Sequence, residues 1–383
     1  MTKKKILTVI GARPQIIKAA ALSRAIQTNF QTELEEILVH TGQHYDENMS
    51  AIFFSELGIP EPHYNLAVGS GSHGEMTAAM LSGLEAILQK EKPAAVIIYG
   101  DTNSTIAAAL AAVKIHIPVV HIEAGLRSFN KAMPEEINRI AADHMSSLLF
   151  VPTQAGMRNL EREGFELNTK NKANPDQPNV YHCGDIMYDN SLYFAQLSRL
   201  KSQILKELNL IANNYILCTI HRDSNTDDPA ALQGILIGLL ELIAQTGLRV
   251  VLPIHPRTKN KINTLLSSDF RAKLDAEARF IFTPPASFLD MIALEENARL
   301  IITDSGGVQK EAYFFAKPCV ILRDQTEWVE IVETGAAVLT GAHTEKIISA
   351  SQRLLNQEIK TGQHIFGDGH AAEFICQKIL SDL

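Results

Sequence analysis

The stretch Ile301-Ile-Thr-Asp-Ser-Gly-Gly-Val-Gln-Lys-Glu-Ala312 predicts a short apolar strand, a tight turn of small residues and then a helix. A strand that stops at Ser305-Gly306-Gly307 leaves bare backbone N–H groups at a helix start, where no bulky side chain keeps a phosphate away. Glu311 comes about one turn into the helix, where it could accept hydrogen bonds from a ribose diol. Helix capping alone also produces Ser-Gly pairs, so an ordinary capped helix is the alternative.

The same alternation of strand and helix extends over nearly the whole chain. The expected strands are Ile6–Ile10, Leu34–Val39, Ala95–Tyr99, Pro118–Ile122, Leu148–Val151, Tyr215–Ile220, Val250–Pro253, Phe280–Thr283, Leu300–Thr303 and Cys319–Leu322. The expected helices include Gln15–Thr28, Gly74–Lys90, Asn103–Lys114 and Ala230–Thr246. Several strands are apolar on both faces, as strands inside a parallel sheet should be. The pattern predicts an α/β protein with parallel sheets covered by helices on both faces.

The chain has 383 residues, which favours two domains over one. A polar stretch with two prolines, residues 168–179, predicts a surface loop beside the boundary. We expect an N-terminal Rossmann-like domain over residues 1–182 and a second one over 183–369, facing each other across a cleft. Ligands of such sheets bind at the C-terminal ends of the strands.

Charge and targeting signals narrow the class of protein. The formal net charge of −8 argues against nucleic acid or an anionic membrane as the main partner. The four cysteines are far apart and form no CxxC pair, which favours free thiols in a reducing compartment. The N-terminus has no signal-peptide core, and no apolar run approaches the roughly 18 residues of a membrane helix. A cytoplasmic protein is therefore expected.

Cationic side chains follow several of the expected strands. Arg13 and Lys18 come after the first strand, where they could reach a diphosphate. In the second half, His221-Arg222 and His255-Pro-Arg257 each follow a strand, and Arg323 follows another. A single histidine at a strand end is usually structural. Together with Ser305-Gly306-Gly307, however, these residues favour a site for a polyanion.

Acidic side chains follow neighbouring strands of the first half. Asp101 and Glu123 each come directly after a strand, and Glu135 opens the next helical pattern near Arg139. Asp101 alone would most often be a helix cap, and Glu135 a first-turn acid favoured by the helix dipole. Glu123 is harder to explain as structural, because a carboxylate directly after a buried strand costs energy unless something uses it.

Two competing motifs require consideration. Gly69-Ser-Gly-Ser-His-Gly74 matches the GxGxxG pattern of dinucleotide-binding proteins, but the strand before it is weak and Asp101 is poorly set to bind a ribose. His40 and His44 are four residues apart, as in some metal sites, but a glycine separates them and no third ligand is near. Neither NAD nor a metal is expected.

Taken together, these motifs resemble the non-hydrolysing UDP-N-acetylglucosamine 2-epimerase family, from Gly11-Ala-Arg-Pro14 to Phe366-Gly-Asp-Gly-His370. The resemblance implies a glycosyltransferase-B-like architecture of two Rossmann-like domains, with the last helix, residues 370–383, packing back on the first. It also implies a homodimer that uses neither metal nor nicotinamide.

The residues support this chemistry independently. The proton at C2 of a 2-acetamido sugar is not adjacent to a carbonyl, so an enzyme must either oxidise C3 with NAD or expel UDP to form a glycal. With the NAD reading weak, elimination and re-addition are favoured. Removing a proton from one face and returning it to the other calls for at least two carboxyl groups.

The match to the family motifs implies a role for each candidate residue. The implied acid/base residues are Asp101, Glu123 and Glu135; which one removes the proton stays open. His221 is counted with the catalytic residues because, with Arg13 and Lys18, it would stabilise the diphosphate. The implied phosphate and ribose contacts are Ser305, Gly306, Gly307 and Glu311. Further residues of the cleft would be Arg139, His255 and Arg323.

Departures from the hexosamine branch point to a different substrate. This chain has Gln15 where that branch has Glu, Asn103 where it has Thr, and Gln325–Trp328 where it has Thr-Thr-Glu-Arg. His221–Asn225 also lacks the Glu common before the Asn. The residues at these positions look more like those of the branch that acts on UDP-2,3-diacetamido-2,3-dideoxy-glucuronate and makes the manno-configured uronate for surface polysaccharide. The alternatives are a UDP-GlcNAc to UDP-ManNAc epimerase, a glycosyltransferase of the same fold, a hydrolysing epimerase, and a binding protein without turnover.

Overall fold

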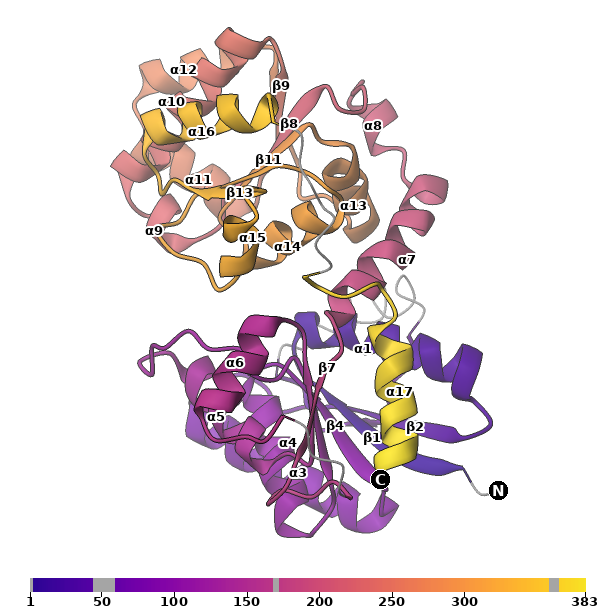
Figure 1. The fold of residues 1–383 in the computed structure, drawn as a ribbon. Coiled ribbons are helices and arrows are strands. Elements are labelled where there is room, and N and C mark those ends of the chain that lie inside the picture. Colours follow the sequence, from indigo (N-terminus) through magenta and orange to yellow (C-terminus); the bar gives the residue numbers. More distant parts are fainter. Residues whose placement is uncertain (1–2, 44–58, 168–171, 358–364) are drawn as a thin grey trace. The chain divides into compact units, whose positions relative to one another are not determined.

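The computed structural model describes residues 3–43, 59–167, 172–357 and 365–383. The chain divides into two compact units: unit 1 comprises residues 1–190 with 364–383, and unit 2 comprises residues 191–363 (Figure 1). The division falls within helix α7 (Ile186–Lys201). Each unit is an α/β body with its own parallel sheet.

Unit 1 alternates strands with helices in the order that the sequence predicts. Its strands are β1 (Lys4–Ile10), β2 (Leu34–His40), β3 (Tyr64–Asn65), β4 (Ala95–Tyr99), β5 (Val119–Ile122), β6 (Leu148–Val151) and β7 (Asn179–His182). Its helices are α1 (Arg13–Ala25), the π-helical turn η1 (Ile26–Phe30), α3 (His73–Glu91), α4 (Asn103–Lys114), α5 (Pro134–Met145), α6 (Gln154–Arg162) and α17 (Ala371–Asp382).

Among the described residues, the strands of unit 1 form one sheet in the order β3-β2-β1-β4-β5-β6-β7, with every pair parallel. Strand order reverses between β1 and β4, because β2 and β3 follow on one side and β5 to β7 on the other. In such sheets the loops after the two central strands diverge and leave a crevice at their C-terminal ends. That switch point is where the polar strand-end residues of the first half converge.

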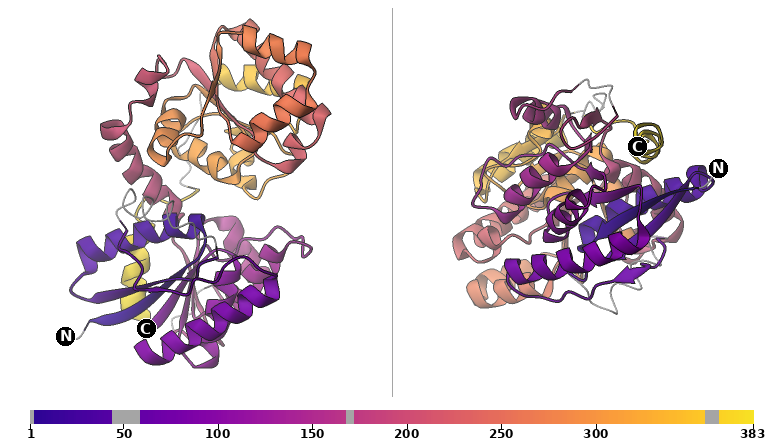
Figure 2. Two further views of the ribbon diagram at one scale, coloured as in Figure 1. Left: turned by 180° about the vertical axis from the view of Figure 1, so that it is seen from behind. Right: turned by 90° about the horizontal axis from the view of Figure 1, so that it is seen from below.

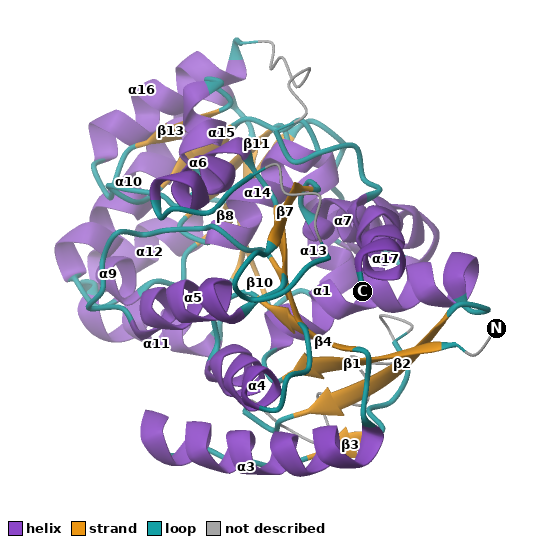
Figure 3. Ribbon diagram, turned by 60° about the horizontal axis from the view of Figure 1, so that its bottom comes forward, coloured by secondary structure: helices purple, strands orange, loops and turns teal. Residues whose placement is uncertain are grey.

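Helices cover both faces of this sheet. Apolar side chains of α3 and α4 pack with those of β1 and β4 in one buried cluster, which includes Met80, Leu84 and Ala108. Figure 3 shows α3 and α4 below the strands and α1 above them. Helix α17 comes from the far end of the chain, yet it packs on α1 within unit 1, as the left view of Figure 2 shows.

Unit 2 repeats the architecture with shorter strands. Its strands are β8 (Tyr215–Thr219), β9 (Arg249–Pro253), β10 (Phe280–Thr283), β11 (Leu300–Thr303), β12 (Cys319–Ile321) and β13 (Ala337–Leu339). Its helices after α7 are α8 (Ile204–Glu207), α9 (Asp223–Thr226), α10 (Pro229–Thr246), α11 (Pro256–Leu265), α12 (Ser268–Ala276), α13 (Phe288–Asn297), α14 (Gly306–Phe314), α15 (Val329–Glu333) and α16 (Thr344–Leu355). The sheet order is β10-β9-β8-β11-β12-β13, so its switch point lies between β8 and β11.

Helix α10 is the one helix among the described residues whose length and apolar composition would let it cross a membrane. The sequence predicts a helix over Ala230–Thr246 at this place, and no membrane span. Seven of its residues are buried, and six of them, including Leu232, Ile235 and Leu239, belong to the apolar core that α10 shares with β8, β9 and α16. A core helix in a sheet protein passes the same length and composition test, so α10 is accounted for by packing.

The predicted fold class is confirmed, and the ten expected strands are all present to within one or two residues at their ends. Three short strands were not among the ten. The segment at β3 was taken for a weak strand and forms only two residues of edge strand. Strand β7 follows the polar loop directly, and β13 has three residues, so neither carries enough apolar pattern to stand out.

Candidate functional site

The turn after β1 is held at the switch point of unit 1 by a glycine and a buried glutamine. A Cβ on Gly11 would lie 2.1 Å from Ser104 Oγ and 2.2 Å from Thr41 Oγ1, so no larger residue fits. The Gln15 side chain is 2% exposed and accepts the backbone N–H groups of Gly11 at 2.9 Å and Ala12 at 3.1 Å. Its amide donates to the Tyr99 carbonyl at 2.9 Å, which ties the end of β1 to the end of β4.

The position of Gln15 explains one departure from the hexosamine branch. The amide of Gln15 supplies a donor to the carbonyl of Tyr99, and an ionised glutamate has no proton for that bond. Gln15 therefore has a structural role in this chain. Arg13, two residues before it, is exposed in the first turn of α1.

Two cation–carboxylate pairs lie at the C-terminal ends of β4 and β5. Lys18 of α1 pairs with Glu123 Oε2, and Arg139 of α5 pairs with Asp101 Oδ2. The side chains of Lys18 and Glu123 are 12% and 11% exposed. The two strands are neighbours in the sheet, with Tyr99 opposite Ile122, so the residues that follow them also lie close together. The structure thus brings four candidate residues of unit 1 to one place.

Gly100 separates the two pairs and has the backbone conformation that glycine favours. Its φ is +58°, and a Cβ there would lie 3.1 Å from Glu123 Oε2 and 3.4 Å from Lys18 Nζ. Glu123 has a φ of +71°, which is rare for a residue with a side chain. A strained backbone at a charged strand end is typical of functional sites, where the surrounding structure enforces it.

Glu135 and Glu136 are adjacent but differ completely in environment. Glu135 is exposed in the first turn of α5, and no hydrogen bond or ion pair joins it to Asp101 or Glu123 within the described residues. Glu136 is 1% exposed and accepts the N–H groups of Ser128 and Phe129 at 2.9 Å, while Arg139 Nη1 lies 2.9 Å from it. Burial alone would raise the pKa of Glu136, but these donors hold it below its ordinary value. Sequence reasoning missed this role.

We expect Gly100→Ala to lower both stability and turnover. A left-handed φ costs an alanine about 1–2 kcal/mol, and the new methyl group would displace the Glu123–Lys18 pair. Gly164→Ala is the matched control: Gly164 has a φ of +92°, but nothing lies within 4 Å of its Cβ position. Urea denaturation and turnover of the UDP-sugar measure the two effects. Equal turnover in the two variants would contradict the role assigned to Gly100.

Asp304 connects the two central strands of unit 2. It is fully buried at the end of β11, and both oxygens of its carboxylate accept the N–H of His221, each at 3.0 Å. It also accepts the N–H of Arg222 and the side-chain amide of Asn225, each at 3.0 Å. These bonds fix the loop after β8 to the turn after β11. His221 and the Ser305 turn are therefore held together at the switch point.

The turn at Ser305 forms the N-terminus of α14, as the opening stretch of sequence predicts. Ser305 is the N-cap residue, and its Oγ accepts the N–H of Val308. A Cβ on Gly306 or Gly307 would meet no protein atom closer than 3.7 Å. The fold therefore does not need these glycines for its own packing. Their effect is to leave open backbone at the start of a helix, which suits an anion.

Glu311 lies in the second turn of α14 and faces a second acid. The Glu295 side chain of α13 is 1% exposed and contacts the Glu311 carboxyl. Burial and the neighbouring Glu311 raise the pKa of Glu295 well above its ordinary value. A neutral Glu295 can donate its proton to Glu311, the expected ribose contact.

We expect the stability of the wild-type protein to fall as the pH rises, and we expect Glu295→Gln to remove this fall. A carboxyl group whose pKa is raised by folding stabilises the folded protein in full at any pH below its unfolded pKa, near 4.3. Between that pH and its folded pKa, the free energy of unfolding falls by about 1.4 kcal/mol for each pH unit. A glutamine keeps the donor and has no proton to lose.

Urea midpoints at about pH 6 and pH 9 would check this expectation. Glu296→Gln is the control, because Glu296 is the next residue and forms an ion pair with the exposed Arg199. The same pH slope in wild type and Glu295→Gln would show that Glu295 is already ionised in the folded protein.

Two histidines of unit 2, His221 and His255, lie close enough for one to influence the pKa of the other. The His221 residue is exposed overall, yet its ring has lost part of its hydration, and this lowers its pKa. The carboxylate of Asp304 opposes this shift, and His255 adds to it. His255 is the exposed N-cap of α11, where its Nδ1 accepts the N–H of Arg257. Arg257 pairs with Asp223 and Asp227, so its charge is compensated locally.

The loop after β12 lies beside the Ser305 turn. Arg323 binds both carboxylate oxygens of Glu327 at 2.9 Å, and Glu327 Oε2 lies 3.7 Å from the Cβ position of Gly306. The indole Nε1 of Trp328 lies at the same distance from that position. The ammonium of Lys310 sits 4.2 Å from the centre of the Trp328 ring. The departure from the hexosamine branch at 325–328 thus changes the lining of the candidate phosphate site.

The competing motifs find no support in the described residues. Gly69 and Gly74 have open space at their Cβ positions, whereas the dinucleotide fingerprint needs its glycines for close approach. The tight glycine of unit 1 is instead Gly11. His40 is buried, which lowers its pKa to about 4, and it accepts the N–H of Gly42 at 2.9 Å. His44 lies outside the described residues, and the described part of the chain has no cluster of three metal-ligating side chains.

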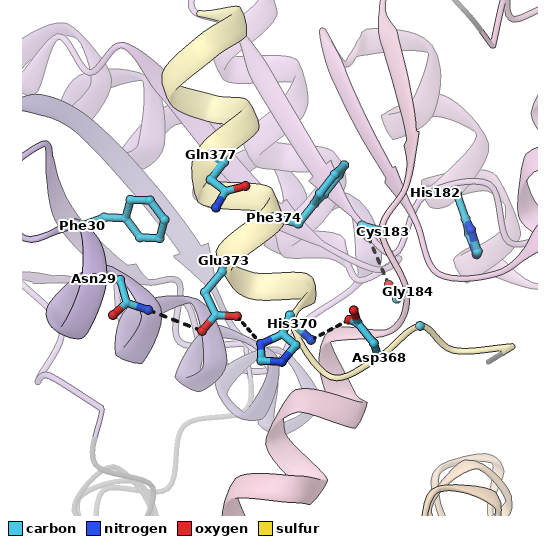
Figure 4. A pocket seen from close by; sticks show the side chains of 11 residues that line it. Asn29, Phe30, His182, Cys183, Gly184, Asp368, His370, Glu373, Phe374 and Gln377 are labelled. Atoms are coloured by element: carbon cyan, nitrogen blue, oxygen red, sulfur yellow. Dashed lines mark hydrogen bonds and ion pairs between the residues drawn. The ribbon is translucent and has the colours of Figure 1, made fainter. Parts of the chain in front are cut away.

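One cavity, of about 950 Å³, lies elsewhere in unit 1 (Figure 4). It is lined by residues of η1, the end of β7 and the start of α17, where Glu373 bonds to His370 at 2.9 Å and to Asn29 at 3.4 Å. It contains none of the candidate residues. A smaller cavity of about 580 Å³ in unit 2 is lined by Arg222 and the candidate Arg323. The charge pairs at the strand ends and the open helix N–H groups therefore define the candidate site, and the 950 Å³ cavity lies outside it.

Comparison with known proteins agrees with this arrangement. The family model described as UDP-N-acetylglucosamine 2-epimerase matches residues 26–380. The chain is 48% identical to the UDP-2,3-diacetamido-2,3-dideoxy-D-glucuronate 2-epimerase of Pseudomonas aeruginosa over 97% of this chain and 98% of that protein. The crystal structure of Methanocaldococcus jannaschii UDP-GlcNAc 2-epimerase in complex with UDP-GlcNAc and UDP is 40% identical, with a TM-score of 0.79 over 97% of this chain and 98% of that one.

The chain therefore belongs to the UDP-N-acetylglucosamine 2-epimerase family. Phytolacca americana UGT2, solved with UDP-2-fluoro-glucose and pterostilbene, is 13% identical with a TM-score of 0.62, covering 99% of this chain and 94% of that one. At that identity the likeness shows the fold alone. The glycosyltransferase-B-like class predicted from the sequence is confirmed.

Proposed function

We propose that this chain is an isomerase that inverts C2 of a UDP-2-acetamido sugar by eliminating UDP and adding it back. The observation that carries the proposal is the pair of carboxylates at the ends of β4 and β5, each beside a cation and separated by Gly100. Two carboxyl groups in such proximity can serve the two faces of one sugar carbon. A phosphate-binding or capping role would not need both.

The reaction follows from these groups. One carboxylate takes the proton from C2, the C1–O bond to the diphosphate breaks, and a C1–C2 double bond forms. A carboxyl group then returns a proton to C2 on the opposite face, and the diphosphate oxygen rebinds C1. We assign Asp101 and Glu123 to this exchange and keep Glu135 as the third candidate, leaving the direction of each open.

Unit 2 would hold the leaving group. The open N–H groups at Ser305, Gly306 and Gly307 suit a phosphate, Glu311 suits the ribose diol, and His221 would donate to the departing diphosphate. Further contacts would come from Arg13, Lys18, Arg139, His255 and Arg323. The site must retain UDP after the C1–O bond breaks, because loss of UDP would leave a glycal that cannot be converted to the epimer.

The favoured substrate is UDP-2,3-diacetamido-2,3-dideoxy-glucuronate, with UDP-N-acetylglucosamine second. The name of the Pseudomonas aeruginosa relative and the residues Gln15 and Gln325–Trp328 support this order. We further propose a cytoplasmic homodimer that supplies a manno-configured precursor for surface polysaccharide.

Incubation with each UDP-sugar in heavy water tests the proposal. We expect deuterium at C2 and a mixture of the two epimers, without any acceptor and with little free UDP. Free UDP and free sugar in proportion to turnover would indicate a hydrolysing enzyme. UDP-sugar binding without exchange would indicate a binding protein, and exchange that needs an acceptor would favour a glycosyltransferase.

A further inference from the structure

A buried histidine–aspartate pair lies directly behind the two carboxylates of unit 1. His121 of β5 and Asp143 of α5 are both fully buried, and His121 Nδ1 lies 2.7 Å from Asp143 Oδ1. The other ring nitrogen, Nε2, lies 2.8 Å from the carbonyl oxygen of Gly100. The assigned chemistry of Asp101 and Glu123 does not use either residue.

The contacts of this pair determine where its protons are. Both ring nitrogens of His121 face oxygen atoms, and a carbonyl can only accept, so Nε2 must carry a proton. Asp143 Oδ2 in turn lies 2.7 Å from Arg127 Nη1 and accepts the N–H of Gly125 at 3.2 Å. Two donors on Oδ2 favour the ionised carboxylate, which leaves the Nδ1 proton on the imidazole.

The charges around the pair balance. His121 and Arg127 supply two positive charges, and Asp143 and Glu163 supply two negative ones, with Arg127 and Glu163 joined at 2.6 Å. Burial acts to raise the pKa of Asp143, but His121 and Arg127 hold it below its ordinary value. Charged groups this deeply buried are expensive unless all of them are paired. A doubly protonated His121 is consistent with that requirement.

The imidazolium holds the backbone that carries the reacting groups. Gly100 donates its N–H to Ile122 at 3.0 Å and receives the His121 proton on its carbonyl, so both of its polar atoms are bound to the end of β5. Asp101 is the next residue along the chain, and Glu123 is two residues after His121. Asp143 also fixes α5, whose Arg139 pairs with Asp101.

We propose that His121 and Asp143 are positioning residues that set the distance between the Asp101 and Glu123 carboxylates through the Gly100 carbonyl. The inference rests on the proposed function, since those carboxylates are assigned there. A misplacement of about 1 Å at a reacting group can cost about 10²-fold in rate. A purely structural pair would change stability and leave the turnover of the folded protein intact.

Nitrogen-15 NMR of the wild-type protein tests the protonation state without any assay of turnover. The chain has 13 histidines, so the His121 signals are assigned by their loss in His121→Gln. We expect Nε2 to carry a proton, because it faces the carbonyl oxygen of Gly100, which can only accept. A bare Nε2 would overturn the inference, and this readout does not depend on whether the protein turns over a substrate.

Turnover of graded variants tests the positioning. His121→Gln keeps a donor for the Gly100 carbonyl, and we expect its kcat to fall about 10-fold; His121→Leu and Asp143→Asn should lose about 10²-fold or more, with KM nearly unchanged. Asp382→Asn is the control, because Asp382 also binds a tyrosine and an amide in unit 1, at Tyr181 and Asn179. It should lose stability and keep its kcat.

The two failures can be told apart. A wild-type protein that exchanges no deuterium at C2 refutes the proposed function, and the NMR result still reports on the pair. A wild-type protein that turns over, with folded Asp143→Asn or His121→Leu retaining its kcat, refutes the positioning role alone. Equal losses in His121→Gln and His121→Leu would also refute it, because the contact with the Gly100 carbonyl would then be irrelevant.

Discussion

Glu123→Gln and Asp101→Asn are each expected to lower kcat by about 10³-fold, within the range that general acid–base groups supply. Both changes keep the size of the side chain and leave an oxygen to face Lys18 or Arg139, but an amide cannot exchange a proton with C2. UDP affinity should change little, since Lys18 and Arg139 keep their charges and the phosphate and ribose contacts assigned to the Ser305 turn and Glu311 are untouched. Deuterium incorporation at C2 and UDP titration measure the two quantities.

Glu91→Gln is the matched control for these variants. Glu91 also pairs with a lysine in unit 1, since its Oε2 lies 2.9 Å from Lys5 Nζ. However, Glu91 is the last residue of α3 and its partner lies at the start of β1, away from the turns after β4 and β5. Its kcat should equal that of the wild type. If folded Glu123→Gln and Asp101→Asn also retain wild-type exchange, the carboxylates have another purpose and the proposed mechanism fails.

Asp304→Asn is expected to weaken UDP binding at least 10-fold and to destabilise the protein by about 2–4 kcal/mol, because buried N–H groups lose their acceptor. The new amide keeps one acceptor oxygen but places an NH₂ group opposite at least one of these N–H groups, so the loop after β8 is held less firmly to the Ser305 turn. Urea denaturation and UDP titration measure the two effects.

Asp228→Asn provides the comparison. Asp228 caps α10 by accepting one N–H, that of Ala230 at 2.9 Å, and asparagine caps helices as well as aspartate does. Its stability should change by at most about 0.5 kcal/mol. Similar losses in the two variants would mean that the shared hydrogen bonds of Asp304 contribute no more than an ordinary cap.

The fold was predictable from sequence to a large extent because buried parallel strands are apolar over their whole length. The strands β4 and β11 are examples, with every residue buried. The turns could be located for the same reason, since each polar residue after such a run marks a strand end. The edge strand β3 and the three-residue β13 lack that signal, and tertiary pairing alone defines them.

The candidate site was predictable in its residue types and less so in its contacts. Sequence placed acids after β4 and β5, but it could not show that Lys18 and Arg139 pair with them, because those cations come from helices whose rotation depends on packing. Glu135 and Glu136 are equivalent on paper, yet about 100° apart around α5, so only the folded helix shows which is buried. The cross-strand roles of His121 and Asp304 are also invisible in the sequence, because their partners come close only when the strands pair.

The left-handed backbone conformation of Glu123 means that a substitution there can raise the stability of the protein and lower its activity at the same time. Glycine would adopt that conformation without strain, so Glu123→Gly relieves the backbone while deleting the carboxylate. A library screened for heat resistance alone would accumulate inactive clones at this position, whereas growth that depends on the sugar product would retain the acid. Stabilising the enzyme by directed evolution therefore requires simultaneous selection for turnover.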